Sequence, residues 1–182
     1  MWEDLFMKTK TLTRTALLFA LSIVMAYLEH LIPPLPFAPP GVKLGLSNII
    51  TMYALFFIGI PQAFLIAVLK AGFVLLTRGT IASLLSLSGG LASVGVMALL
   101  SIPGRKDDSK KLTYLFLSIS GAIFHNLGQL VIVYFMISHS FLAYIPVLII
   151  SGIVMGLITG SLLYLLLPAL HHSFGIGRKG DA

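Results

Sequence analysis

The sequence predicts an all-α, polytopic membrane protein with six transmembrane helices and both termini in the cytoplasm. Of its 182 residues, 58% are hydrophobic and 10% are charged, with a mean hydropathy of +1.02. A soluble domain carries roughly a quarter charged residues. The apolar residues form runs close to the about 20 residues that a spanning helix needs. Basic residues gather beside alternate ends of these runs, as the positive-inside rule describes.

The composition also limits the class of function. The formal net charge is +6, but most of the excess lies beside span ends, where it sets orientation and does not indicate nucleic-acid binding. The chain has no cysteine, which excludes disulfides and cysteine-ligated metals. Because the spans leave no room for a separate soluble domain, we expect residues 1–182 to form a single integral membrane domain.

The first span is predicted from about residue 12 to residue 31. Residues 1–10 mix apolar and charged side chains, so they form either a short interfacial helix or a partly ordered terminus. Lys8, Lys10 and Arg14 at the start of the span place the N-terminus in the cytoplasm.

A proline-rich stretch separates the first two spans. Five prolines lie within residues 33–40, and proline fixes φ and removes a backbone donor. Residues before proline also favour extended geometry. The stretch therefore predicts a stiff, extended outer connector, followed by a short helix over about residues 42–58.

The remaining chain predicts four further spans, of which the third begins at Pro61, a position where the missing donor costs nothing. The loop after Pro103 holds four basic residues, so we expect it to be cytoplasmic. Gly152, Gly156 and Gly160 indicate close helix packing in the last span, which we expect Pro168 to end. The six helices are expected over about residues 12–31, 42–58, 61–77, 81–102, 112–138 and 141–167.

Polar side chains are concentrated in the outer half of this predicted bundle. With a rise of about 1.5 Å per residue, His125 lies roughly 20 Å from the inner end of its helix, and Lys70 lies near the midplane. Charges in a bilayer usually face a bundle interior or a cavity. We therefore expect one outward-opening polar pocket that binds a substrate through Glu29, His30, Lys43, Asn48, Lys70, Arg78, His125, Asn126 and Gln129.

Each of these residues has an alternative role. Lys43 and Arg78 can extend to lipid headgroups, and Glu29 can simply pair with Lys43. His125 and Gln129 share a helix face at i, i+4, where bonds to a neighbouring helix are the alternative. Asn126 lies about 100° round the helix, which favours packing against a neighbour.

Three cations against one carboxylate favour a small anionic ligand whose apolar part contacts the helix walls. Catalysis is disfavoured, because Asp107 and Asp108 lack the second aspartate pair of a diphosphate-binding magnesium site. No serine nucleophile with its base, and no Walker ATP-binding loop, is evident. His171 and His172 form a lone pair at a helix end. We expect no catalytic residue, no bound metal and no cofactor.

Several segments together resemble one bacterial family. Residues 40–48 read Pro-Gly-Val-Lys-Leu-Gly-Leu-Ser-Asn, residues 88–90 read Ser-Gly-Gly, and residues 121–129 read Gly-Ala-Ile-Phe-His-Asn-Leu-Gly-Gln. With Glu29 before the proline run, they resemble the heptaprenyl diphosphate synthase component I family, also called Gx transporter proteins. The resemblance covers most of residues 10–168.

The architecture is also similar to the substrate-binding S components of energy-coupling factor (ECF) transporters. This resemblance implies a subunit of a bacterial plasma-membrane importer that binds a vitamin-like, quinone or isoprenoid precursor outside the cell. Its implied partners are a transmembrane T component and two ATPase subunits. The Ala16 and Ala20 pair matches the Ala-x-x-x-Ala face that docks the T component. The alternatives are a non-catalytic membrane subunit of a heptaprenyl diphosphate synthase, and a secondary carrier or channel that acts alone.

Overall fold

The structure is a computed structural model that describes residues 2–31, 45–101, 110–136, 143 and 145–174. Within these ranges every element of regular secondary structure is helical. The helices are α1 (Trp2–Leu31), α2 (Leu46–Phe57), α3 (Ile60–Arg78), α4 (Thr80–Ser101), α5 (Lys110–Met136) and α6 (Ile145–Phe174).

Five of the described helices are long and apolar enough to cross a membrane. The exception is α2, whose 12 residues rise about 18 Å, less than the about 30 Å of a bilayer core. The helix predicted over residues 42–58 is thus shorter at its start, because Gly45 is non-helical with φ of 78°. Residues 42–44 lie outside the described ranges.

Two helix ends differ from the predicted ones. Residues 2–10 are helical and continuous with α1, so the first helix begins before residue 12, although its candidate membrane span covers only Thr9–Glu29. The expectation that Pro168 ends the last helix is wrong, since α6 continues through it to Phe174. Proline is tolerated inside membrane helices because neighbouring groups and local adjustments satisfy the freed carbonyl.

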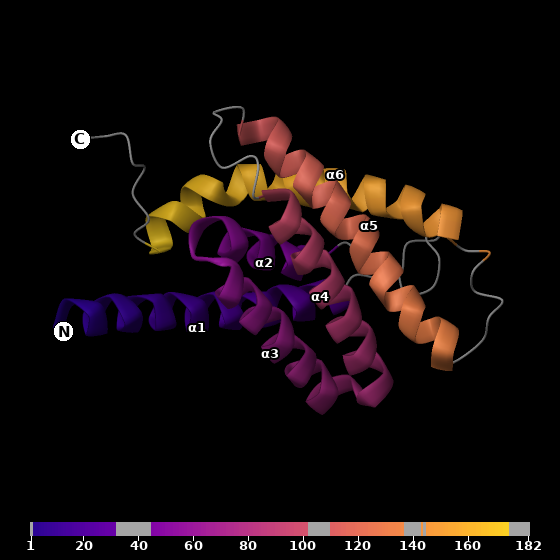
Figure 1. Cartoon of the computed structure of the whole chain (residues 1–182), viewed down its shortest axis with the longest axis horizontal. Helices are drawn as coiled ribbons and strands as arrows, with labels where there is room; N and C mark the ends of the chain where they lie inside the picture. Colours follow the sequence, from indigo (N-terminus) through magenta and orange to yellow (C-terminus); the bar gives the residue numbers. More distant parts are fainter. Residues whose placement is uncertain (1, 32–44, 102–109, 137–142, 144, 175–182) are drawn as a thin grey trace.

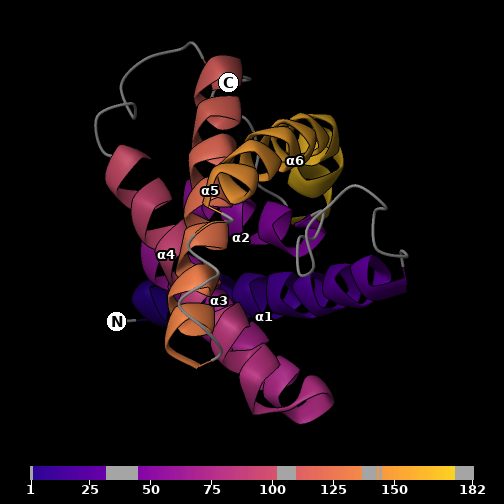
Figure 2. The same ribbon diagram turned by 90° about the vertical axis from the view of Figure 1, so that its right-hand side faces the viewer.

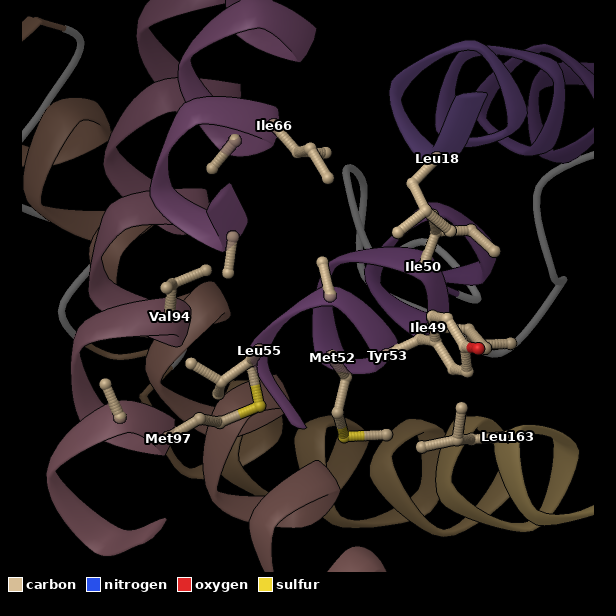
Figure 3. Close-up of a cluster of buried hydrophobic side chains, with 14 of the residues drawn as sticks. Leu18, Ile49, Ile50, Met52, Tyr53, Leu55, Ile66, Val94, Met97 and Leu163 are labelled. Atoms are coloured by element: carbon tan, nitrogen blue, oxygen red, sulfur yellow. The ribbon is translucent and has the colours of Figure 1, made fainter. Parts of the chain in front are cut away.

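The short helix α2 forms the centre of the molecule. In Figures 1 and 2 it lies among α1, α3, α4 and α6, and it contacts all four. Eight of its residues are buried, from Ser47 to Leu55. Figure 3 shows Ile50 beside Leu18 of α1, and Leu55 beside Met97 of α4. The core is therefore built around a helix that the others enclose.

Glycines bring α5 against both of its neighbours. A Cβ on Gly156 of α6 would lie 2.4 Å from the Ile119 Cα, and one on Gly128 of α5 would lie 2.7 Å from the Ser88 carbonyl oxygen. These distances leave no space for a side chain. The glycine repeat of α6 thus packs on α5, and Figure 1 shows α5 running beside α4.

Candidate ligand-binding site

A cavity of about 210 Å³ lies among the helices, and all six of them contribute to its lining. Lys43 and the side chain of His30 are outside the described part of the chain, so their predicted roles stay predictions. The other seven residues predicted for the pocket all line this cavity, namely Glu29, Asn48, Lys70, Arg78, His125, Asn126 and Gln129.

Lys70 brings a charged group into the apolar interior. Its side chain is 4% exposed, and it lies halfway along α3. The Nζ atom donates to Ser47 Oγ at 3.2 Å and to Asn48 Oδ1 at 3.1 Å. Both acceptors belong to the first turn of α2. These bonds hold the ammonium group at the cavity wall, because a buried charge without partners is costly.

Glu29 also fixes the start of α2, through a backbone group. The buried carboxylate of Glu29 accepts a hydrogen bond from the Gly45 backbone N–H through Oε1. Gly45 has φ of 78°, a left-handed conformation that favours glycine. A Cβ there would lie 3.5 Å from both Asn48 Nδ2 and Thr159 Cγ2. Glu29, Gly45 and Thr159 therefore meet at one side of the cavity.

His125 and Gln129 interact within α5. Gln129 Nε2 lies 3.0 Å from His125 Nε2, at the i, i+4 spacing that the sequence showed. Gly89 of α4 makes room for the pair, since a Cβ on it would lie 2.9 Å from His125 Cε1. Both side chains line the cavity, and their mutual bond runs along one helix.

Asn126 connects two helices and also reaches the cavity. Its Nδ2 donates to the Leu148 carbonyl at 3.0 Å and to Ser151 Oγ at 3.3 Å, both on α6. Packing against a neighbour, the alternative raised by its position on the helix, is therefore present. Both of these bonds use the amide nitrogen, so the amide oxygen of Asn126 is the atom that could accept a hydrogen bond from a ligand.

Arg78 is the last residue of α3 and is half-buried at the cavity. It lies eight residues beyond Lys70, or about 12 Å along the helix. Among the described lining residues, two cations accompany one carboxylate, Glu29. The cavity therefore has an excess of positive charge even without Lys43.

Sequence reasoning missed the hydroxyl and thioether groups of the cavity. Hydroxyls are common packing groups in membrane helices, so their type alone gives no indication. Ser118 is seven residues before His125, two turns along one face of α5, and this periodicity points to it. The missed lining residues of these two kinds are Ser47, Ser86, Ser93, Ser118, Thr159, Met52, Met97 and Met155.

In the described residues no group of three or more His, Asp or Glu side chains is placed to hold a metal ion. His171 instead contacts aromatic rings: its ring centroid lies 4.6 Å from that of Phe57 and 5.9 Å from that of Tyr53. This end of α6 is a packing region away from the cavity lining.

The helices and the cavity define the class of this chain: an α-helical, multi-pass membrane protein with a polar cavity among its helices. The model of the heptaprenyl diphosphate synthase component I family matches residues 18–166, and the chain belongs to that family. No curated protein and no solved structure matches the chain.

Proposed function

We propose that the chain is the substrate-binding S component of an ECF-type importer in a bacterial plasma membrane. In this role it captures a small, anionic, vitamin-like molecule or a quinone or isoprenoid precursor from outside. Six spans with both termini inside, and a cavity open to the outer side, are parts of this proposal.

The observation that carries the proposal is Lys70. A charge near the middle of a span costs several kcal/mol and marks a functional site by default. Here the side chain is 4% exposed, contacts the first turn of α2 and lines a cavity. A purely structural cation does not need an adjoining cavity that is also lined by Arg78 and by the amide groups of Asn48 and Gln129.

The partner assignment is supported by the outer surface of α1. Ala16 and Ala20 are both exposed, and Leu12 and Val24 continue the same four-residue spacing with 66% and 51% exposure. Two small residues between two larger ones let another helix approach closely. We assign this face to the T component, and ATP hydrolysis to two separate ATPase subunits.

Native mass spectrometry of the protein purified from its own membranes tests the proposal. We expect about one retained small molecule per chain, together with a membrane partner and ATPase chains. Loss of the retained mass in Lys70→Met would assign it to the cavity. Purification with a prenyl synthase and without ATPases would reject the importer.

The family description favours a second candidate, a non-catalytic membrane subunit of a heptaprenyl diphosphate synthase. The cavity argues against its holding the product. A cavity of about 150 Å³ binds a single benzene molecule, so a seven-unit prenyl chain needs several times the 210 Å³ available. This candidate predicts a stable complex with a soluble prenyl synthase.

A further inference from the structure

The cavity holds two chemically different sets of polar side chains, which specify the ligand more closely. Both sets contact the start of α2. Lys70 bonds Ser47 and Asn48, and with Arg78 it forms the donor side. Glu29 bonds Gly45, next to Thr159, and these residues belong to the acceptor side.

The donor side comes from α3. Lys70 and Arg78 carry only N–H donors and are positively charged. Each of these groups matches a carboxylate or another compact anion, because charge-assisted hydrogen bonds are about twice as strong as neutral ones.

The acceptor side comes from α1, α5 and α6. Either hydroxyl can donate in the 2.8 Å bond between Ser118 and Thr159, and when Thr159 Oγ1 donates to the Met155 carbonyl at 2.9 Å, this bond uses the Ser118 proton. Both hydroxyls then present only lone pairs, and the neighbouring Glu29 carboxylate is also an acceptor. This side therefore matches a ligand O–H or N–H.

The cavity volume limits the size of the ligand. The volume of about 210 Å³ is somewhat larger than that of an apolar cavity of about 150 Å³ that binds one benzene molecule. The ligand therefore has on the order of ten non-hydrogen atoms. A single ring with two substituents has this size.

The wall between the two sides suits a flat ring. Gly121 and Ala122 line the cavity between Ser118 and His125 on α5, and Met97 packs onto Gly121, where a Cβ would lie 2.7 Å from its Sδ. Met52, Met97 and Met155 reach the cavity from α2, α4 and α6. Thioether sulfur makes favourable contacts with aromatic rings.

We infer that the ligand is a single-ring aromatic acid that carries a hydroxyl or amino group in addition to its acid group. This inference rests on the proposed role of the cavity as the ligand site. The acid group lies at Lys70 and Arg78, and the donor group lies at Glu29, Ser118 and Thr159.

Binding of three probes to the purified full-length protein in nanodiscs tests this inference by calorimetry. The probes are benzoate, 4-hydroxybenzoate and 4-aminobenzoate. We expect at least one of the substituted acids to bind roughly tenfold or more tightly than benzoate, because it satisfies buried acceptors that benzoate leaves unpaired. Phenol, which lacks the acid group, is expected to bind more weakly still.

Thr159→Val tests the acceptor side. We expect it to abolish the preference, so that the substituted acid and benzoate bind with similar affinity. Binding of either probe also shows that the variant is folded. Thr13→Val is the matched control, because Thr13 makes the same bond to the carbonyl four residues back, but on the exposed part of α1. If Thr159→Val does not fold, Ser118→Ala makes the same test.

The outcomes separate this inference from the proposed function. Equal binding of benzoate and both substituted acids overturns the inference and leaves an anion site. Failure of all probes to bind, with a different molecule retained in native mass spectrometry, also overturns only the inference. Failure of all probes, with nothing retained, overturns both.

Discussion

Lys70 places an ammonium group near the middle of a 19-residue apolar helix, against two side-chain acceptors of α2. At the scale of residues, this contact favours an anion as the proposed ligand. A neutral wall of serines would accept many polar molecules. A buried cation with Arg78 nearby discriminates in favour of an anion, because its field is weakly screened in the interior.

Replacing Lys70 by methionine keeps the volume and removes the charge. We expect affinity for 4-hydroxybenzoate to fall about 10- to 150-fold, the equivalent of a charge-assisted bond of about 1.5–3 kcal/mol. Calorimetry measures this. Lys10→Met, on the exposed part of α1, is the control and is expected to bind normally. Unchanged affinity in Lys70→Met would contradict the assignment of the anion site.

The gathering of polar residues was predictable from depth along the helices. Glu29, Lys70 and His125 are unexpected inside apolar runs, and a common depth points to a common cavity. The pairing of Ser118 with Thr159, 41 residues apart, was not predictable. It depends on how α5 is rotated against α6, and glycine packing fixes that rotation only in three dimensions.

At the scale of helices, contact between backbones holds the cavity walls in place. The glycine repeat of α6 lies directly on α5, and Asn126 adds hydrogen bonds from α5 to α6. Because Ser118 and Thr159 come from these two helices, their 2.8 Å separation depends on this close packing.

A methyl group at Gly156 would force α5 and α6 apart. We expect Gly156→Ala to destabilise the protein by about 1–3 kcal/mol, the usual cost of overpacking, since its Cβ would lie 2.4 Å from the Ile119 Cα. Thermal unfolding in detergent measures the change. The control is Gly72→Ala in α3, where no heavy atom lies within 4 Å of the added Cβ. There we expect no loss of stability, because alanine favours helix. Equal effects in the two variants would contradict the packing argument.

Bulky residues on the exposed face of α1 should separate binding from transport. We expect Ala16→Phe combined with Ala20→Phe to abolish ATP-dependent uptake in cells and to leave ligand binding by the purified protein unchanged. Ala169→Phe, at an exposed alanine of α6, is the control and is expected to transport normally. Normal uptake in the double variant would count against docking at α1.

The helices themselves were largely predictable, and their ends less so. Apolar runs locate spans because an uncovered polar backbone is excluded from lipid. The start of α2 was placed too early because hydropathy does not show that Gly45 is left-handed. The predicted end of α6 at Pro168 was wrong because neighbouring groups in a membrane helix can satisfy the carbonyl that proline leaves unbonded, so the helix continues.

At the scale of the whole molecule, all six helices contribute to one cavity, so a ligand bound there would contact residues from every helix. A ligand that binds only the folded state stabilises it by RT ln(1 + [L]/Kd), about 2.7 kcal/mol at one hundred times Kd. We therefore expect the unfolding temperature to rise continuously with 4-hydroxybenzoate concentration. The Lys70→Met variant is expected to show little rise, and an equal rise in both proteins would place the binding elsewhere.

The shortness of α2 has a consequence for biogenesis. A helix of 12 residues is too short to be stable across a lipid bilayer by itself. We therefore expect α2 to pack into place only after α1 and α3 have inserted into the membrane. The centre of the fold is then completed late in synthesis. A nascent chain released after residue 58 should leave α2 accessible to water-soluble labelling reagents, whereas chains that extend beyond α4 should protect it.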